Sequence, residues 1–271
     1  MKRPNTTNAL APVLYIPHGG GPLPLLGDPD HQQLVDFLRL TASSLGEPSA
    51  IVVISAHWEE EQVTITNGAM PELMYDYYGF PEESYQIHYP ASGAPALAGK
   101  IGALLQVAGI DARLDDQRGF DHGLFVPLKI MYPQATIPCV QLSLLASLDP
   151  RGHIAMGKAL APLRSENILI VGSGFSFHNL RAFFVGPTGM PDQQNEAFSR
   201  WLIDTCTDEG LTFAEREERL AAWEKAPHAR YCHPREEHLL PLHVCLGMAQ
   251  AKARLVFDRE VMGKKACSFL W

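Results

Sequence analysis

The fold is decided by a strand-and-loop stretch, Ile168-Leu169-Ile170-Val171-Gly172-Ser173-Gly174-Phe175-Ser176-Phe177-His178. Its first four residues are apolar and mostly β-branched, which is typical of a strand buried on both faces of a sheet. Three further runs share this character: Val13–Ile16, Ile51–Ile54 and Ile137–Leu142. Segments with helical periodicity separate or follow the runs: Gln32–Leu45, Ala94–Ala108, His153–Leu163, Asn195–Glu209 and Leu239–Gln250. Strands that alternate with helices predict an α/β sandwich, with a largely parallel or mixed central sheet flanked by helices.

The chain length of 271 residues allows one large domain or two small ones. Hydrophobic residues make up 46% of the chain and charged residues 19%, which suits a globular protein with a sizeable core. Two stretches have little periodicity and are expected to be long loops, Asn67–Ala94 and Pro187–Gln194. Neither has the character of a flexible linker, so we expect a single domain over residues 1–271 with its core at about residues 13–260.

Charge and cysteine content argue against several classes of function. The formal net charge of −8 disfavours electrostatic binding to nucleic acid or to an anionic membrane. No apolar run approaches the length that crosses a bilayer, and no apolar segment of a secretion signal precedes Pro12. The five cysteines form no Cys-x-x-Cys pair, which fits reduced thiols better than a disulfide framework. We therefore expect a cytoplasmic protein that binds a small molecule, with neither nucleic acid nor membrane as a partner.

Histidines stand where the predicted strands end. His18 follows the first strand, His57 follows the second, and His178 closes the stretch quoted above. In open α/β sheets ligands bind beyond the carboxyl ends of the strands, so histidines from separate strands can converge there. Imidazole nitrogens suit divalent zinc, iron, copper and nickel. The sequence therefore predicts a metal site, with further candidate histidines at positions 122, 233 and 238.

Two other classes of enzyme, an esterase and a zincin protease, would also use histidines, but the sequence lacks a motif that each of them requires. The run His18-Gly19-Gly20-Gly21 matches the oxyanion-hole signature of lipases and esterases. Those enzymes also need a nucleophile elbow, Gly-x-Ser-x-Gly, and Ser173 comes nearest with Val171 and Phe175 in the glycine positions. A zincin protease is disfavoured as well, because the chain has no His-Glu-x-x-His helix.

An ordered set of motifs runs from residue 13 to about residue 250: Pro17-His18-Gly19, Ser55-Ala56-His57-Trp58, Tyr78-Gly79-Phe80-Pro81, His88-Tyr89-Pro90-Ala91, Gly119-Phe120-Asp121-His122-Gly123, Gly172-Ser173-Gly174, His178-Asn179-Leu180 and Glu237-His238-Leu239-Leu240-Pro241-Leu242. With this set the chain resembles the extradiol ring-cleavage dioxygenases of the LigB superfamily (class III), and within it most the DOPA 4,5-dioxygenase type. The resemblance implies a non-haem metal enzyme that uses O2 to open a catechol ring, DOPA-like or otherwise substituted, beside its two hydroxyls. It implies Fe(II) for activity and allows Zn(II) in the isolated protein.

The resemblance also implies which residues bind the metal. His18, His57 and His238 are expected to be the ligands, with the neighbouring Glu237 as the fallback for the third position. His178 is expected to be the general base, because imidazole exchanges protons near neutral pH. It is also expected to contact the metal when substrate is absent.

Four more residues are predicted to take part in the reaction or to bind substrate. His122 is the second catalytic candidate, as a hydrogen-bond donor to bound oxygen or substrate. Its alternative role is structural, as a helix-start histidine behind an Asp121 N-cap. Trp58, Tyr78 and His228 are the candidates for contact with the aromatic substrate.

Two alternatives to the dioxygenase stay open at this point. The same histidines would also serve a zinc-dependent hydrolase on the same scaffold, in which the metal activates water. A binding protein without activity is disfavoured because all of the expected metal histidines are present.

Overall fold

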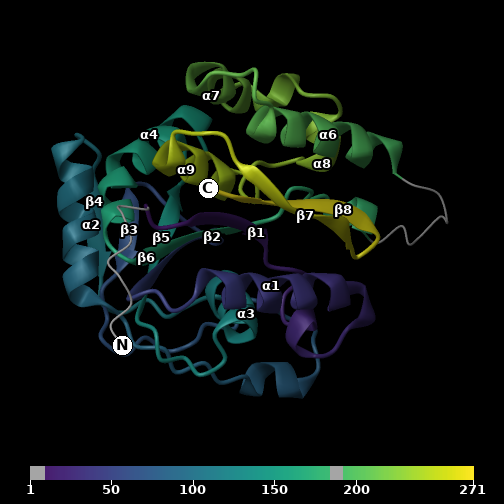
Figure 1. Ribbon diagram of the computed structural model, residues 1–271. Coiled ribbons are helices and arrows are strands. Elements are labelled where there is room, and N and C mark those ends of the chain that lie inside the picture. Colours follow the sequence, from purple (N-terminus) through teal and green to yellow (C-terminus); the bar gives the residue numbers. More distant parts are fainter. Residues whose placement is uncertain (1–9, 184–191) are drawn as a thin grey trace, which may run out of the picture.

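The computed structural model describes residues 10–183 and 192–271 (Figure 1). The expected loop Pro187–Gln194 therefore lies mostly outside the described residues, as does the N-terminal stretch considered for a secretion signal. The other expected loop, Asn67–Ala94, is confirmed: it holds only one short 3-10 helix, Glu82–Gln86, and two isolated bridges.

An eight-stranded mixed sheet forms the centre of the described chain, in the order β4-β3-β5-β2-β6-β1-β8-β7. Its strands are β1 (Val13–Pro17), β2 (Ala50–Glu60), β3 (Val63–Thr66), β4 (Ala112–Asp115), β5 (Cys139–Leu145), β6 (Ile168–Gly174), β7 (Arg254–Val261) and β8 (Lys264–Leu270). The four central strands β5, β2, β6 and β1 run parallel to one another. On one side of this group, β8 pairs antiparallel with β1 and forms a hairpin with β7. On the other side, β3 pairs antiparallel with β5. The predicted α/β sandwich with a mixed sheet is confirmed.

Helices cover both faces of the sheet (Figure 1). They are α1 (Gln32–Leu45), α2 (Pro95–Val107), α3 (His122–Met131), α4 (Pro150–Leu160), α5 (Leu180–Phe183), α6 (Gln193–Thr207), α7 (Phe213–Ala221), α8 (Ala229–Cys232) and α9 (Leu240–Ala249). In the view of Figure 1, α1 and α3 lie below the sheet, while α4, α6, α7 and α9 lie above it. Helix α1 has the predicted bounds, and α6 begins two residues early because the Asp192 side chain accepts hydrogen bonds from the first-turn amides of Gln194 and Asn195, both at 3.1 Å.

Helix α9 is buried along its whole length, packed between α4 and the strands β6 and β1. Glycines permit this close packing, because a Cβ at Gly157 of α4 would meet the backbone of α9, and one at Gly247 would meet the backbone of α4. The end of the loop that precedes α9 is therefore held firmly over the carboxyl ends of β1 and β6. That position brings His238 into the site described below.

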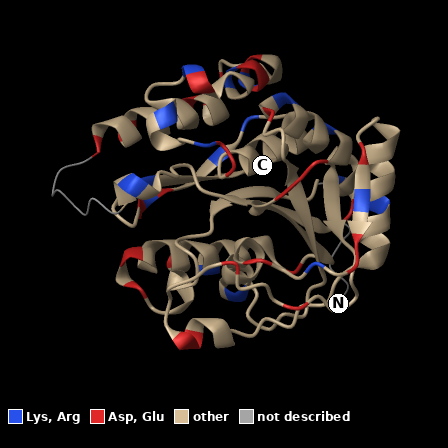
Figure 2. Cartoon of the chain, turned by 180° about the vertical axis from the view of Figure 1, so that it is seen from behind, with Lys and Arg blue, Asp and Glu red and all other residues tan. Residues whose placement is uncertain are grey.

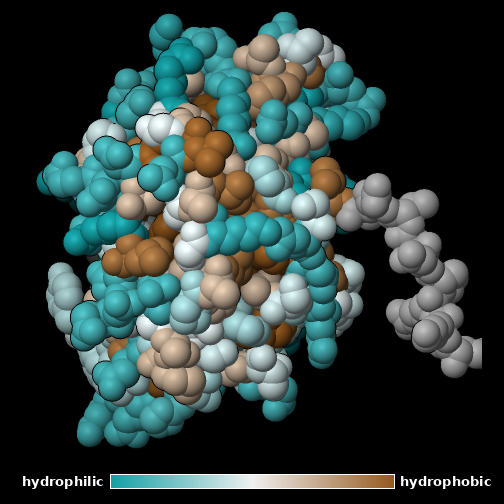
Figure 3. All heavy atoms as spheres, turned by 90° about the vertical axis from the view of Figure 1, so that its left-hand side faces the viewer, coloured by the Kyte–Doolittle hydropathy of each residue, from teal (hydrophilic) through white to brown (hydrophobic). Residues whose placement is uncertain are grey.

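The sequence did not predict the outer strands β3, β4, β7 and β8. β4 and β7 form the two edges of the sheet and are partly exposed. β3 and β8 are more buried, but β3 has only four residues, two of them threonines, and β8 begins with two lysines. Figure 3 views the side of the molecule on which α2 lies, and apolar patches appear there among hydrophilic residues. Val107 and Leu114 are among the exposed apolar residues of α2 and β4, at 89% and 46% exposure.

Charged groups are spread over the exterior. In Figure 2, blue and red segments are interspersed along the outer helices of the visible face. Among the residues that the structure describes, no helix combines the length and the apolar character needed to span a membrane.

Candidate active site

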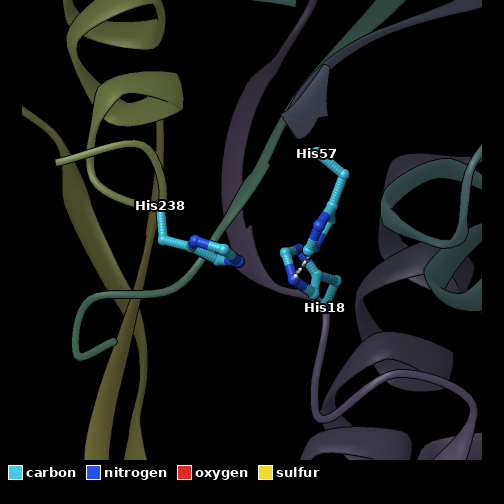
Figure 4. A group of neighbouring side chains, drawn as sticks. All are labelled: His18, His57 and His238. Carbon is cyan, nitrogen blue, oxygen red and sulfur yellow. Dashed lines mark hydrogen bonds between the residues drawn. The ribbon is translucent and has the colours of Figure 1, made fainter. Parts of the chain in front are cut away.

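The structure brings three of the predicted metal ligands together at the carboxyl ends of the central strands. His18 directly follows β1, His57 lies inside β2, and His238 lies two residues before the start of α9. The nearest nitrogens of the three rings lie within 4.8 Å of one another, and His18 Nε2 is 2.9 Å from His57 Nε2. Figure 4 shows His238 pointing at this pair from the opposite side. The expected meeting of imidazoles from distant segments is therefore found.

An irregularity in β2 places His57. The sequence predicted that this strand ends at Ile54, but the strand continues to Glu60 with a register shift against β5 between Ile54 and Glu59. Such an irregularity re-aims a side chain beside a functional site. The hydroxyl of Ser55 fixes the turn of the backbone: it accepts from His57 N at 3.2 Å and donates to Asp121 Oδ1 at 2.8 Å.

A serine on the neighbouring strand sets the tautomer of His18. Ser173 Oγ donates its only hydrogen to the carbonyl oxygen of Gly123 at 2.5 Å, so toward His18 it acts as an acceptor. It lies 3.1 Å from His18 Nδ1, which must therefore carry the ring hydrogen. The lone pair of His18 is then at Nε2, the atom that faces His57. This is the form in which imidazole binds a metal.

The glycine run after His18 is a tight turn that His31 holds in place. Gly19 and Gly21 have positive φ angles of 89° and 56°. The amide of Gly20 donates to His31 Nε2 at 3.0 Å, and His31 Nδ1 bonds to Asp28 Oδ1 at 2.7 Å. The Gly20 amide is thus already engaged, which removes one of the donors that the esterase interpretation requires.

One carboxylate contacts both His178 and His238. The two rings stack face to face, with centroids 3.4 Å apart and planes at 14°. Glu237 Oε1 lies 3.0 Å from Nδ1 of each ring. Arg235 Nη1 lies 3.5 Å from the other oxygen of Glu237. The guanidinium of Arg235 also forms a bidentate ion pair with Glu59, with both contacts at 2.5 Å.

A second carboxylate holds His122 on the other flank. Asp76 Oδ1 accepts from His122 N at 3.0 Å and bonds to His122 Nδ1 at 2.8 Å. The His122 ring lies 3.9 Å from the ring of His57 by centroids. Asp76 was missed by the sequence analysis, because it stands in the aperiodic loop Asn67–Ala94 and carries no motif of its own.

The first turn of α3 also differs from its expected form. His122 does begin the helix, but the side chain of Asp121 makes no capping bond. Asp121 is fully buried and instead bonds to Ser55, Arg118 and Gln141. Its place as acceptor for the helix amide is taken by Asp76 from a distant loop. The structural alternative for His122 is therefore incomplete, since the predicted cap is used elsewhere.

The electrostatics favour three neutral metal-binding rings beside two charged carboxylates. Burial, followed by repulsion among the neighbouring imidazoles, holds the pKa values of His18, His57 and His238 well below their usual range. Burial opposes ionisation of Asp76 and Glu237, but hydrogen bonds and attraction from His122 and His178 outweigh it and lower both carboxyl pKa values.

The three histidines suit a divalent transition metal, which binds to ring nitrogens that carry no hydrogen. Two nitrogens bound at right angles to one ion at about 2.1 Å lie about 3 Å apart, close to the His18–His57 spacing.

The predicted substrate-contact residues differ in their exposure. Trp58 is 2% exposed, donates from Nε1 to Glu60 Oε1 at 2.9 Å and lies under the guanidinium of Arg118. Tyr78 is 92% exposed, and His228 is exposed at the start of α8 with a positive φ of 56°. Tyr77 lies beside the site, with its ring 5.7 Å from that of His122. The substrate-binding role of Trp58, Tyr78 and His228 stays a prediction.

Comparison with known proteins places this site in a family. Residues 13–267 match the family described as the catalytic LigB subunit of aromatic ring-opening dioxygenase. The dioxygenase tasH of Hapsidospora irregularis is 42% identical over 285 residues, covering 98% of this chain and 87% of that protein. The 4,5-DOPA dioxygenase extradiol of Beta vulgaris is 37% identical over 253 residues, covering 91% of this chain and 90% of that protein. A crystal structure of an uncharacterized Escherichia coli K12 protein superposes with a TM-score of 0.78 at 32% identity, covering 96% of this chain and 99% of that one.

The chain belongs to the LigB family of aromatic ring-opening dioxygenases. It is a metal-dependent extradiol dioxygenase, as the ordered motifs predicted. Nothing in the comparisons favours the alternative of a zinc-dependent hydrolase.

Proposed function

We propose that His18, His57 and His238 hold one divalent metal, Fe(II) in the active enzyme, and that the protein opens the ring of DOPA or a related substituted catechol with O2. The observation that carries this assignment is the convergence of three buried imidazoles on one point. The ring of His178 stacks on that of His238, and the ring of His122 lies beside that of His57. Zn(II) would fit the same nitrogens, so it is the expected contaminant of the isolated protein.

The bound metal supplies positive charge that favours ionisation of a catechol hydroxyl and brings the catechol and O2 together. His178 then acts as the base for the remaining hydroxyl. Glu237 occupies its Nδ1 side, which leaves Nε2 as the atom that takes the proton. The His178 ring stacks on that of His238, which supports a role beside the proposed metal ligands, and we expect it to contact the metal when substrate is absent.

His122 is assigned to hydrogen bonding with the bound substrate or O2. Its Nδ1 bonds to Asp76, and the backbone amide of His122 holds that same carboxylate in place, so the ring cannot turn without losing the Nδ1 contact. Nε2 is left as the atom available to a ligand. A fixed group of this kind stabilises charge as it develops during the reaction, without the cost of reorganising at that moment.

The substrate class is inferred from the relatives and from the aromatic loop beside the site. Relatives from Beta vulgaris, Portulaca grandiflora and Escherichia coli are 4,5-DOPA dioxygenases. Tyr75, Tyr77 and Tyr85 pack against one another beside His122 and form a wall suited to an aromatic ring. We assign Trp58, Tyr78 and His228 to the outer part of the substrate pocket, and we propose that the whole chain works as one cytoplasmic catalytic domain.

A direct assay tests the proposal. The metal-free protein is loaded with Fe(II) under anaerobic conditions and mixed with DOPA, caffeate, protocatechuate or catechol in air-saturated buffer. We expect O2 consumption together with a yellow ring-opened semialdehyde for DOPA or one of its analogues. His153→Gln is the matched control, because His153 bonds only to the backbone of Asp149 and Leu145 and should keep full activity. Absence of O2 uptake with every catechol, together with ester hydrolysis by the Zn(II)-loaded protein, would contradict the proposal.

A further inference from the structure

Glu237 has an unusual set of neighbours. A single carboxylate oxygen, Oε1, lies 3.0 Å from Nδ1 of both His178 and His238. The second oxygen, Oε2, is buried and has no hydrogen-bond partner among the described residues, with Arg235 as its nearest cation at 3.5 Å. The side chain is only 12% exposed, so water does not compete freely for these contacts. Both imidazoles therefore depend on the same acceptor.

The contact decides which nitrogen of each ring is free. A neutral imidazole carries one ring hydrogen, on either Nδ1 or Nε2. A carboxylate can only accept, so Glu237 fixes the hydrogen at Nδ1 in both rings. Both lone pairs are then at Nε2, in two rings that are stacked with nearly parallel planes and have both Nδ1 atoms at the same carboxylate oxygen. In Figure 4 the ring of His238 points toward His18 and His57.

The same geometry argues that Glu237 is not itself the third metal ligand. Its accepting oxygen lies 3.0 Å from His238 Nδ1, whereas the far tip of the His238 ring is directed at His18 and His57 in Figure 4. The neighbouring Glu236 is engaged elsewhere, since its Oε2 pairs with Arg230 Nη1 at 2.6 Å. Two adjacent glutamates thus occupy different environments, and only one of them contacts the histidines.

We propose that Glu237 is a positioning residue that sets the tautomer of the metal ligand His238 and of the base His178 through one shared oxygen. This inference deepens the proposed function and rests on its assignment of those two histidines. Metal binding and proton removal are then coupled: a change at Glu237 weakens the metal site and misplaces the base together. A carboxylate that orients a metal-binding histidine is worth about 10- to 100-fold in metal affinity.

Glu237→Gln tests the proposal, with Glu236→Gln as the matched control. Gln keeps the shape of Glu, but its amide group presents two hydrogens and one neutral oxygen, so it cannot accept equally well from both rings. The tautomers are measured in the metal-free protein by ¹H–¹⁵N long-range NMR of labelled histidine, with signals assigned through His178→Ala and His238→Ala. We expect Nδ1–H signals for both rings in the wild type and in Glu236→Gln, and loss of at least one in Glu237→Gln.

Metal affinity and kinetics provide independent readouts. Competition with a chelator should show Zn(II) binding about 10- to 100-fold weaker in Glu237→Gln. At saturating Fe(II), kcat should fall by at least tenfold while KM for the catechol changes less, because the base rather than the substrate pocket is disturbed. Glu236→Gln should match the wild type in all of these measurements.

Three results would overturn the proposal: Nε2–H tautomers in the wild type, Zn(II) affinity in Glu237→Gln within twofold of wild type, or a loss of affinity as complete as in His238→Ala. The last result would make Glu237 a metal ligand. The tautomers and the Zn(II) affinity are measured without substrate. They therefore test the role of Glu237 independently of the ring-opening assay, which tests the proposed function.

Discussion

Ser173 and His18 face each other across two neighbouring strands, with Ser173 Oγ 3.1 Å from His18 Nδ1. Their contact follows from the register of the sheet, in which β1 and β6 run parallel and Ile16 stands opposite Ser173. The carbonyl of Gly123, in the first turn of α3, takes the serine hydrogen. Three separate segments thus leave Nε2 of His18 as the nitrogen that is free for the proposed metal.

Ser173→Ala should weaken the metal site without unfolding the protein. Loss of the acceptor frees His18 to rotate or to change its tautomer, so Zn(II) affinity should fall by about 10- to 100-fold. Chelator competition measures this change. Ser176→Ala is the control: its hydroxyl is equally buried but accepts from the Cys267 amide instead of from a site histidine. Equal affinities in the two variants would contradict the assigned role of Ser173.

His178→Ala should separate metal binding from catalysis. The ligands His18, His57 and His238 are unchanged, so the variant should keep one equivalent of metal by elemental analysis. Removal of a general base lowers kcat by about 10²- to 10⁴-fold, and we expect a loss in that range. Activity within a few fold of the wild type would remove His178 from the base assignment.

Asp76→Asn should affect turnover more than metal content. The amide keeps an acceptor for the His122 backbone but no longer pairs as an anion with the His122 ring, so the ring is held less firmly. A small misplacement of a reacting group can cost about 100-fold in rate, and kcat should fall by up to that factor. Steady-state O2 uptake gives the rate. The control is Asp116→Asn, whose exposed carboxylate bonds only to Asn67 and should leave kcat unchanged.

His243 should make the stability of the metal-free protein depend on pH. Burial lowers the pKa of His243 to about 4, whereas histidine in the unfolded chain titrates at about 6.5. Between these values the unfolded state binds a proton that the folded state does not, so stability is lost as the pH falls through this window. The contribution is about 1.4 kcal/mol for each pH unit.

His243→Gln removes this titration while keeping a donor for the carbonyls of Leu220 and Leu239. The free energy of unfolding, measured in urea from pH 7.5 to 4.5, should therefore fall less steeply in the variant than in the wild type. Parallel curves would show that His243 does not titrate as assigned. The other buried histidines are common to both proteins and cancel in the comparison.

Several features of the fold followed from local pattern alone. Helix α1 was predicted at its observed bounds because its apolar residues recur on one face, and the buried central strands were predicted from β-branched runs. The outer hairpin of β7 and β8 was missed, since its exposed residues mix polar and apolar types and leave no clean alternation. The extension of β2 past His57 was also missed, because a bulge has no periodic signal.

The sequence by itself determined the α/β class, the family and the histidines proposed as metal ligands, because strand ends and ordered motifs can be recognised in the order of residues along the chain. Only the tertiary structure decided how those histidines are held. Asp76 reaches His122 across 46 residues, and Ser173 reaches His18 across 155. Such partners leave no local pattern, because their proximity arises from strand register and loop packing. Which nitrogen of each ring is free is a property of these contacts, so it could be inferred only once the chain was folded.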